Sequence, residues 1–349
     1  MSDRIEDYIA ETPQWLDRIR QGSAELFAEI SERKFDRIIL TGSGTSYHSA
    51  IQTEQTIREF TGLAVHSFYP FGVTQELIGD GARTLFVGIS QGGGSQSTYD
   101  AMSIARNAGC TVASMSASDD TYIDRLADYR LKVTIGDEFA GAKTKGYYGT
   151  KLMLLLLAQA IGSSNGTIDE TAAADFGSRL DSTIARFPEV FERTKAWVSE
   201  HVDEFTSSQD LRFVGPKSIF GDTLEVALKT LETMRVPVSG YEFDEFIHGI
   251  YNAVNDNSYV VFMDDGSIPR MQRMVEVLSE WSDHIYVIAN HDAPYVDFNI
   301  GDVPADELQT FFFPMAGQLL AALVPWQKGY DPTPPKDPTF HDKLSSKRN

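Results

Sequence analysis

The sequence predicts an α/β protein with two similar halves, each built around a parallel sheet flanked by helices. Short apolar strands alternate with helical segments, which is typical of right-handed βαβ units. This alternation occurs twice, before and after a polar stretch at 163–167. A chain of 349 residues also suits two domains of roughly 150 residues each. We therefore expect a repeat of pattern rather than of residue identity.

The first half begins with apolar residues at helical spacing, which predict a helix over 5–31. Apolar runs then predict four strands, at 37–40, 84–89, 112–115 and 131–135. Helices are expected at 46–60, 98–108 and 149–161. The stretch 163–167 is polar and contains glycine, so it marks the expected break between the domains.

The second half repeats the alternation after a bridging helix. Strands are expected at 211–214, 259–263 and 284–288, and helices at 222–234, 271–281 and 308–324. The predicted division is N-terminal helices over 1–34, a first α/β domain over 35–165, a linking helix over 166–205, a second α/β domain over 206–327 and a C-terminal tail over 328–349.

The composition and net charge restrict which kinds of molecule the protein is expected to bind. The chain has 30 Lys and Arg residues against 50 Asp and Glu residues, which gives a net charge of −20. Proteins that bind nucleic acid need a basic face, so we expect no nucleic-acid partner. Hydrophobic residues make up 42% and charged residues 23%, which excludes a disordered chain.

Cysteine usage and hydropathy bear on the compartment. Cys110 is the single cysteine, so it has no intramolecular disulfide partner, and no Cys/His spacing typical of a metal site occurs. The N-terminus is acidic and lacks the apolar core of a signal peptide, and no run of 18 apolar residues is present. We expect a cytoplasmic protein with no metal, cofactor or membrane partner.

Two loops that follow predicted strands are rich in glycine and hydroxyl side chains. Residues 41–46 read TGSGTS and residues 90–95 read SQGGGS. Ligands of parallel sheets bind at the carboxyl ends of strands, where helix N-termini attract anions. Backbone N–H groups and hydroxyls can hold a phosphate there without Lys or Arg, so the acidic net charge does not exclude an anionic ligand.

These loops also suit two other kinds of structure. Serine and threonine are common N-cap residues, so each loop alone is equally well a tight connection. A dinucleotide site is disfavoured because Tyr47 stands where the third glycine of GxGxxG belongs, and no GxxxxGK[ST] motif occurs. Two such loops after strands of one half favour a phosphate site.

The loops together resemble the SIS (sugar isomerase) phosphosugar-binding family. The likeness is to the isomerase part of glucosamine-6-phosphate synthase, to fructosamine-phosphate deglycases and to aminosugar-phosphate deaminases. It covers nearly the whole chain as two SIS domains, each a flavodoxin- or Rossmann-like three-layer sandwich. The family loops commonly read GxGTS and SQSGET, so Gly92 and Gly94 replace a serine and an acid here.

The resemblance implies a set of substrate-binding residues. Glu138 with Thr144 and Lys145 matches a further stretch of the family. The residues expected to hold the phosphate and the sugar hydroxyls are Gly44, Thr45, Ser46, Ser90, Gln91, Gly92, Ser95 and Lys145.

The second half carries the expected catalytic groups. Residues 227–232 read ALKTLE and resemble the family's ALKLKE helix, which implies that Glu232 is the proton-transfer base. Residues 245–249 read EFIHG and resemble ELKHG, which implies that His248 assists ring opening. Moving a proton between C1 and C2 needs such a base and a second acid/base group near the ring oxygen. Without the resemblance, Glu232 suits a solvated helix face and His248 a capping or packing role.

The tail supplies a third candidate. Pro338 to Lys343 has the Pro-to-Lys spacing of the family's PRNLAK segment, although Thr339 replaces its arginine. The resemblance implies that Lys343 reaches the carbonyl region of the open sugar, with Lys336 as the alternative. A frayed basic tail is the competing interpretation.

The function expected from the resemblance is an isomerase, deaminase or deglycase. Its substrate would be an amino-hexose 6-phosphate or a fructosamine 6-phosphate, converted through an enediol or enolamine. The lack of a glutaminase domain favours the breakdown direction. A non-catalytic sugar-phosphate sensor or regulator and an isomerase of a non-amino sugar phosphate remain alternatives. The resemblance also implies a homodimer whose sites are shared between subunits.

Overall fold

The computed structural model describes residues 4–301, 303 and 306–348. The chain forms two compact units, which are described separately. The sheet-1 unit comprises Glu11–Glu138, Lys145–Ile184 and Lys336–Asn349, and the sheet-2 unit comprises Met1–Ala10, Phe139–Thr144 and Ala185–Pro335. This division falls inside a long helix, whereas the boundaries predicted from sequence were drawn at loops.

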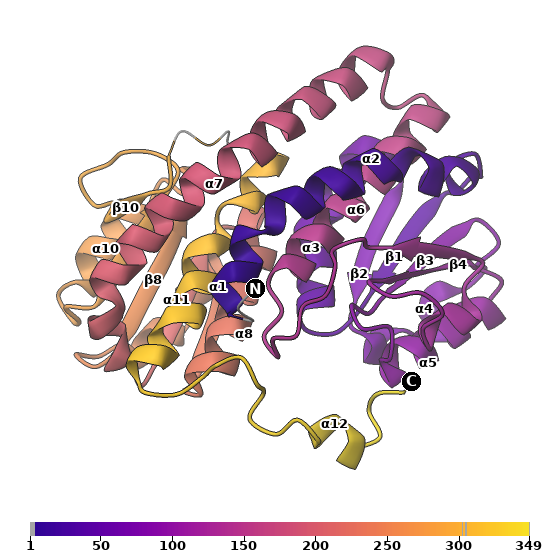
Figure 1. Ribbon diagram of the computed structural model, residues 1–349. Helices are drawn as coiled ribbons and strands as arrows, with labels where there is room; N and C mark the ends of the chain where they lie inside the picture. Colours follow the sequence, from indigo (N-terminus) through magenta and orange to yellow (C-terminus); the bar gives the residue numbers. More distant parts are fainter. Residues whose placement is uncertain (1–3, 302, 304–305, 349) are drawn as a thin grey trace. The chain divides into compact units, whose positions relative to one another are not determined.

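The sheet-1 unit contains a parallel sheet of five strands in the order β2-β1-β3-β4-β5 (Figure 1). Its strands are β1 (Arg37–Thr41), β2 (Ala64–Phe68), β3 (Thr84–Ile89), β4 (Thr111–Ser116) and β5 (Tyr129–Lys132). Every residue of β3 and β4 is buried. Central strands of a parallel sheet are covered on both faces, which explains their continuous apolar runs.

The helices of this unit surround that sheet. They are α2 (Thr12–Ser31), α3 (Thr45–Thr61), α4 (Gln75–Ile78), α5 (Gln96–Asn107), α6 (Lys145–Asn165) and α12 (Phe340–Lys343), with 3₁₀ turns η1 (Pro70–Gly72) and η2 (Ile123–Leu126). Helix α6 packs against α2 and α3 and is buried along most of its length. It is therefore the central helix of the unit, with apolar residues on all sides.

The sheet-2 unit has the strand order β10-β9-β8-β6-β7, again parallel. Its strands are β6 (Leu211–Gly215), β7 (Val238–Glu242), β8 (Tyr259–Asp264), β9 (Ile285–Ala289) and β10 (Phe298–Asn299). In both sheets the first strand lies between the second and the third along the chain. The repeat expected from the pattern is therefore a repeat of topology.

Helices α8 and α11 pack together in this unit, and α1 packs against α11. The bounds are α1 (Ile5–Ala10), α8 (Phe220–Met234), α9 (Phe243–Phe246), α10 (Met271–Leu278) and α11 (Pro314–Gln327), with η3 (Lys217–Ile219), η4 (Ile250–Ala253) and η5 (Glu307–Phe311). Helix α7 (Glu170–Thr206) belongs to both units.

The stretch Glu307–Gln327 is long and apolar enough to cross a membrane by composition. Within the protein, 94% of its apolar window is buried. It contains η5 and α11, and it contributes to the core of the sheet-2 unit. Its hydropathy is therefore accounted for by packing.

Several element bounds differ from those expected. The predicted helix 5–31 is divided into α1 and α2 at Glu11, because Pro13 lacks the N–H group that a continuous helix would need there. Strands β2, β7 and β10 were not predicted, and β5 begins and ends earlier than 131–135. Helix α10 ends at Leu278 rather than 281, and the predicted helix 308–324 is divided into η5 and α11.

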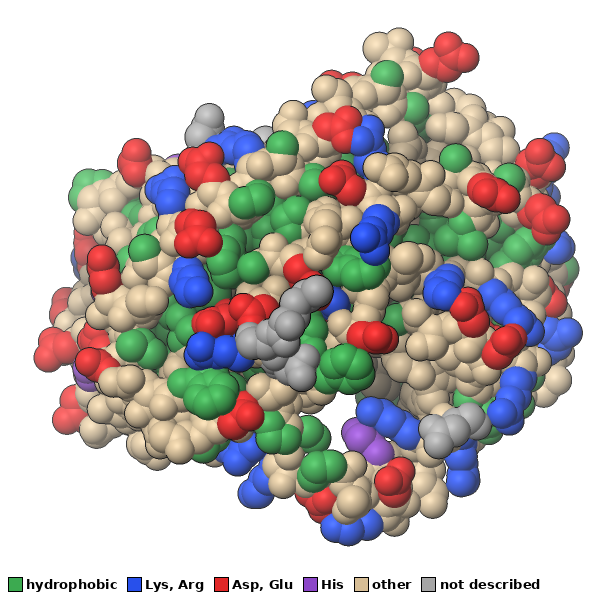
Figure 2. All heavy atoms as spheres, in the orientation of Figure 1, with side chains coloured by type: hydrophobic (Ala, Val, Ile, Leu, Met, Phe, Trp, Pro, Cys, Tyr) green, Lys and Arg blue, Asp and Glu red, His purple; other side chains and the backbone are tan. Residues whose placement is uncertain are grey.

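The net charge of the chain is −20. Figure 2 shows acidic and basic side chains interspersed on the visible face. Exposed pairs such as Arg83–Asp36 at 2.7 Å and Arg106–Asp128 at 3.1 Å contribute to this mixture. Such pairs contribute about 0–1 kcal/mol each, so they affect solubility more than stability.

Two helical glycines provide a test of how closely α6 packs. A Cβ atom at Gly149 in α6 would lie 2.4 Å from Ile135 Cγ2, whereas one at Gly22 in α2 would meet nothing within 4 Å. We expect Gly149→Ala to lower the free energy of unfolding by about 1–3 kcal/mol through overpacking. Gly22→Ala should raise it by about 0.5–1 kcal/mol, because alanine favours the helix. Chemical denaturation measures both, and equal effects would contradict this account of α6.

Candidate functional site

The strand order of the sheet-1 unit creates a switch point between β1 and β3. Chain connections leave this point in opposite directions, and ligands of such sheets bind outside the carboxyl ends of the strands there. Residue Thr41 at the end of β1 pairs with Gly88 near the end of β3. The two glycine-rich loops therefore begin at neighbouring positions of the sheet.

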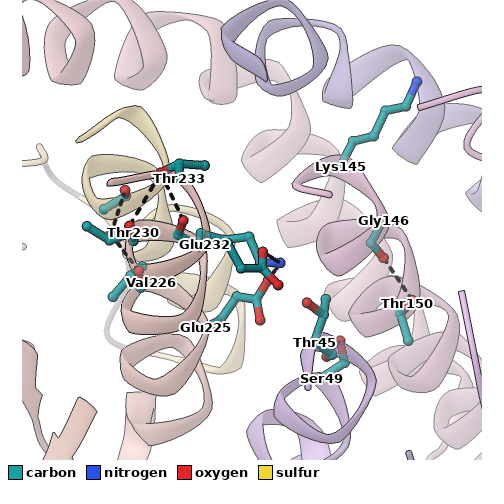
Figure 3. A network of polar contacts seen from close by, with 12 residues as sticks. Thr45, Ser49, Lys145, Gly146, Thr150, Glu225, Val226, Thr230, Glu232 and Thr233 are labelled. Carbon is teal, nitrogen blue, oxygen red and sulfur yellow. Dashed lines mark hydrogen bonds and ion pairs between the residues drawn. The ribbon is translucent and has the colours of Figure 1, made fainter. Parts of the chain in front are cut away.

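The first loop, residues 42–46, makes a close turn from β1 into α3. A Cβ atom at Gly42 would lie 2.6 Å from Ser46 Cβ and 3.0 Å from the carbonyl oxygen of Ile89, so only glycine fits. Gly44 has φ 55° and is the N-cap of α3. Figure 3 shows Thr45 and Ser49 on the first turns of this helix, where Ser49 Oγ donates to the Thr45 carbonyl at 2.9 Å.

The second loop, residues 90–95, is tied to the strand beside it. The Ser90 N–H donates to the Met115 carbonyl at 3.0 Å, and the Gln91 carbonyl accepts from the Ala117 N–H at 2.9 Å. Gly93 adopts φ 68° and its N–H donates to the Ser90 carbonyl at 2.8 Å. Ser95 caps α5, because its Oγ accepts from the Thr98 N–H at 3.3 Å.

Gln91 is held by α6. Its Oε1 lies 3.2 Å from Thr150 Oγ1, and the Thr150 hydroxyl donates to the Gly146 carbonyl at 2.8 Å, a contact that Figure 3 shows. Among the described atoms, the buried Gln91 Nε2 has no hydrogen-bond partner. A buried amide without an acceptor is costly, so this group suits an acceptor supplied by a ligand.

The structure places Lys145 in a buried ion pair. Its side chain is 1% exposed, and Nζ bonds to the carboxylate of Glu11 and, at 2.6 Å, to the carbonyl of Asp137. Glu138 accepts from the N–H groups of Lys145 and Gly146 at 3.2 and 3.3 Å, so it caps α6. The Lys145 ammonium group thus links α2 and the 137–138 segment to α6. The sequence predicted a substrate contact for this lysine.

In the sheet-2 unit, Glu232 lies on α8 and its side chain is 36% exposed. Lys229 Nζ lies 2.7 Å from Glu232 Oε2 and 3.8 Å from Oε1 of the buried Glu225, and Figure 3 shows both glutamates on α8. The lysine is 2% exposed. It holds the Glu232 carboxylate in one orientation. Sequence reasoning gave Lys229 no role, although the i,i+3 spacing of lysine and glutamate was the available signal.

His248 follows α9 and is exposed. Its Nδ1 lies 2.6 Å from the carbonyl oxygen of Asp244. A carbonyl only accepts hydrogen bonds, so Nδ1 carries the hydrogen and Nε2 is left as the proton acceptor. This tautomer suits a group that exchanges protons with a ligand.

The switch point of the sheet-2 unit, between β6 and β8, differs in charge. Asp264 at the end of β8 is fully buried, and burial raises its pKa. It accepts from the Tyr295 hydroxyl at 3.0 Å, while the neighbouring Asp265 accepts from Ser218. Two carboxyl groups at this edge disfavour a phosphate. The glycine- and hydroxyl-lined edge of the sheet-1 unit is the better anion site.

The third expected catalytic residue, Lys343, lies on α12. Its side chain is 64% exposed, and Nζ lies 2.6 Å from Asp337 Oδ2. The hydrogen bonds from Lys343 and Thr339 lower the pKa of Asp337. The ammonium group is thus engaged within the tail itself.

Comparisons with known proteins agree with this architecture. The family model of the SIS domain matches residues 29–160. A candidate phosphosugar isomerase of Clostridium difficile 630 is 42% identical, covers 99% of both chains and superposes with a TM-score of 0.95. A candidate sugar-binding protein of Salmonella typhimurium LT2 is 38% identical over 91% of this chain and 98% of its own, with a TM-score of 0.83.

Curated relatives are longer. The glutamine–fructose-6-phosphate aminotransferase (isomerizing) of Pyrococcus horikoshii is 27% identical over 342 residues, which are 94% of this chain and 56% of that protein. The chain thus spans about half the length of the curated relatives it matches. The two parallel sheets and the full-length match confirm the predicted fold and family: this chain belongs to the double-SIS phosphosugar isomerase family.

Proposed function

We propose that this protein is an enzyme acting on an amino-hexose 6-phosphate or a fructosamine 6-phosphate through an enediol or enolamine. The observation that carries the proposal is the carboxylate of Glu232, held at 2.7 Å by the buried ammonium group of Lys229. A positioned carboxylate that remains partly exposed suits proton abstraction from a bound sugar. Membership of the sugar-phosphate isomerase family supports the same reaction class.

The phosphate would bind at the switch point of the sheet-1 unit. Its oxygens would accept from the backbone of the two loops, from the N-termini of α3 and α5, and from side chains of Thr45, Ser46, Ser90, Gln91 and Ser95. The amide of Gln91 supports this role, because its buried Nε2 has no acceptor among the described atoms. A cradle of N–H and O–H donors binds an anion in a chain of net charge −20.

The proton steps follow from the two catalytic groups. Nε2 of His248 would take the proton of the anomeric hydroxyl and deliver it to the ring oxygen, which breaks the bond between the anomeric carbon and the ring oxygen and opens the sugar. The Glu232 carboxylate would then remove a proton from the carbon next to the carbonyl or imine and return it to the neighbouring carbon. Isomerisation ends there, whereas deamination or deglycation continues with attack of water on the imine and release of the amine.

We also propose a cytoplasmic homodimer with shared sites. His248 is exposed and its Nε2 is free to accept, which suits a group that serves a site completed by a second subunit.

The single cysteine, Cys110, is buried, and burial raises its pKa to about 11, so the thiol is unreactive as expected of a structural residue. Lys343 remains the candidate for the carbonyl end of the open sugar.

A substrate screen tests the proposal directly. Phosphorylated hexosamines and fructosamines would be incubated with the protein, with ammonia or amine release and ketose–aldose conversion measured in parallel. We expect turnover of at least one compound with an amino or amine-linked group. Binding without turnover across the screen would contradict an enzyme and indicate a sugar-phosphate sensor.

Glu232→Gln tests the proton-transfer base. This variant keeps the shape and a hydrogen-bond acceptor for Lys229 but removes the base, so kcat should fall by about 10²–10⁴ while phosphosugar binding persists. The matched control is Glu280→Gln, an exposed glutamate of the same unit, which should keep wild-type activity. Full activity of the Glu232 variant would exclude the proposed mechanism.

Ser90→Ala and Thr45→Ala test the phosphate cradle. Each removes one hydroxyl donor, so KM for a phosphorylated sugar should rise roughly tenfold, as expected for one hydrogen bond to a charged group. Ser118→Ala, an exposed serine of the same unit, serves as the control. An unchanged KM in both loop variants would remove the phosphate from this position.

A further inference from the structure

The C-terminal end of the chain pairs with the second glycine-rich loop. Residues Ser95 and Lys347 form an antiparallel bridge. The Gln96 N–H donates to the Ser346 carbonyl at 3.2 Å, and the Arg348 N–H donates to the Gly94 carbonyl at 2.8 Å. Figure 1 shows the C-terminus beside α5, the helix that begins at this loop. Two backbone hydrogen bonds therefore join the tail to the loop, within one compact unit.

Gly94 is shaped by this contact. A Cβ atom there would lie 2.5 Å from the carbonyl oxygen of Arg348, a distance too short for any side chain. The backbone of Gly94 is outside the left-handed region that Gly93 occupies, so its conformation alone does not require glycine. The glycine is therefore needed because the tail lies against it. The tail backbone thus occupies the space that a side chain of residue 94 would fill.

The tail (residues 336–348) makes defined contacts, whereas the competing interpretation from sequence was a frayed end. His341 Nδ1 lies 2.8 Å from Ser346 Oγ, which links α12 to the docked segment. Lys343 and Asp337 form an ion pair at 2.6 Å near the start of this tail. These contacts restrict the tail before it docks, so docking of residues 345–348 costs less conformational entropy.

The docked segment also changes the charge at the loop. Residues 90–95 contain no Lys or Arg, whereas the tail carries Lys347 and Arg348. Arg348 Nε donates to Gln96 Oε1 at 3.3 Å, which fixes its guanidinium group beside the first turn of α5. The tail thus adds two positive charges next to a loop of neutral donors.

We propose that residues 345–348 are a clip that holds the second loop in its phosphate-binding shape, with Lys347 and Arg348 as positioning residues that attract the anion. The inference rests on the proposed function, because it assigns the phosphate to this loop. Removing the clip leaves the loop to be ordered by the ligand, so affinity for a sugar phosphate should fall more than turnover at saturation.

Hydrogen exchange on the full chain tests docking without any ligand. Gly94→Ala should speed exchange of the Gln96 and Arg348 amides, because the added Cβ displaces the tail. Gly92→Ala is the control for docking, since its Cβ would meet nothing within 4 Å, and it should leave both amides protected. Equal protection in wild type and Gly94→Ala would overturn the clip.

Calorimetric titration with fructose 6-phosphate and with inorganic phosphate tests the ligand side. A chain ending at Leu344 should bind fructose 6-phosphate roughly tenfold more weakly than the full chain, as for the loss of about two hydrogen bonds that order the loop. Gly94→Ala should cause a similar loss in the full chain and no further loss in the shortened chain, because both changes remove one contact.

A variant without the two tail charges tests whether the tail acts through the shape of the second loop or through electrostatic attraction of the anion. Lys347→Gln with Arg348→Gln should keep both amides protected, weaken binding, and reduce its salt dependence. Equal affinity of the full and shortened chains would exclude the clip while leaving the proposed function intact. Failure of the intact protein to bind either probe would instead exclude the proposed phosphate site, and hydrogen exchange would still decide whether the tail docks.

Discussion

The pairing of β1 with β3 is the constraint on which the candidate site depends. These strands are separated along the chain by strand β2 and by α3, η1 and α4, yet Thr41 lies opposite Gly88 in the sheet. Their carboxyl ends therefore place two donor-rich loops next to each other. Gly42 makes this possible, because a side chain there would collide with Ser46 and with the carbonyl of Ile89. The order of the strands in the sheet therefore decides which loop side chains lie together.

The two units share a topology but differ in chemistry at the same edge. The sheet-1 unit presents glycine, serine and threonine at its switch point, whereas the sheet-2 unit presents Asp264 and Asp265. A phosphate is favoured by the first arrangement and repelled by the second. In the sheet-2 unit the candidates for proton transfer are Glu232 on α8 and His248, which follows α9. The two units thus share a fold and present different side chains at this edge.

Two buried lysines show how the same residue type takes different roles. Lys145 and Lys229 are both nearly inaccessible, and each lies against carboxylates. A buried ammonium group needs such partners, because leaving it unpaired costs several kcal/mol. Lys145 uses its pair to join α2 to α6. Lys229 uses its pair to orient Glu232, which is accessible to a ligand. The partner side chain is 22% exposed for Lys145 and 36% exposed for Lys229, which is why Glu232 is the candidate for proton transfer.

The sequence by itself determined the central strands, the two loops and the motif around Glu232, because each is encoded by a local run of apolar residues, glycines or charges. It missed β2 and β7, which are edge-side strands with mixed burial and therefore lack the continuous apolar signal. Tertiary structure alone decided the partner of Lys145 and the docking of the tail on Gly94. Both join residues more than a hundred positions apart, and no local pattern records such contacts.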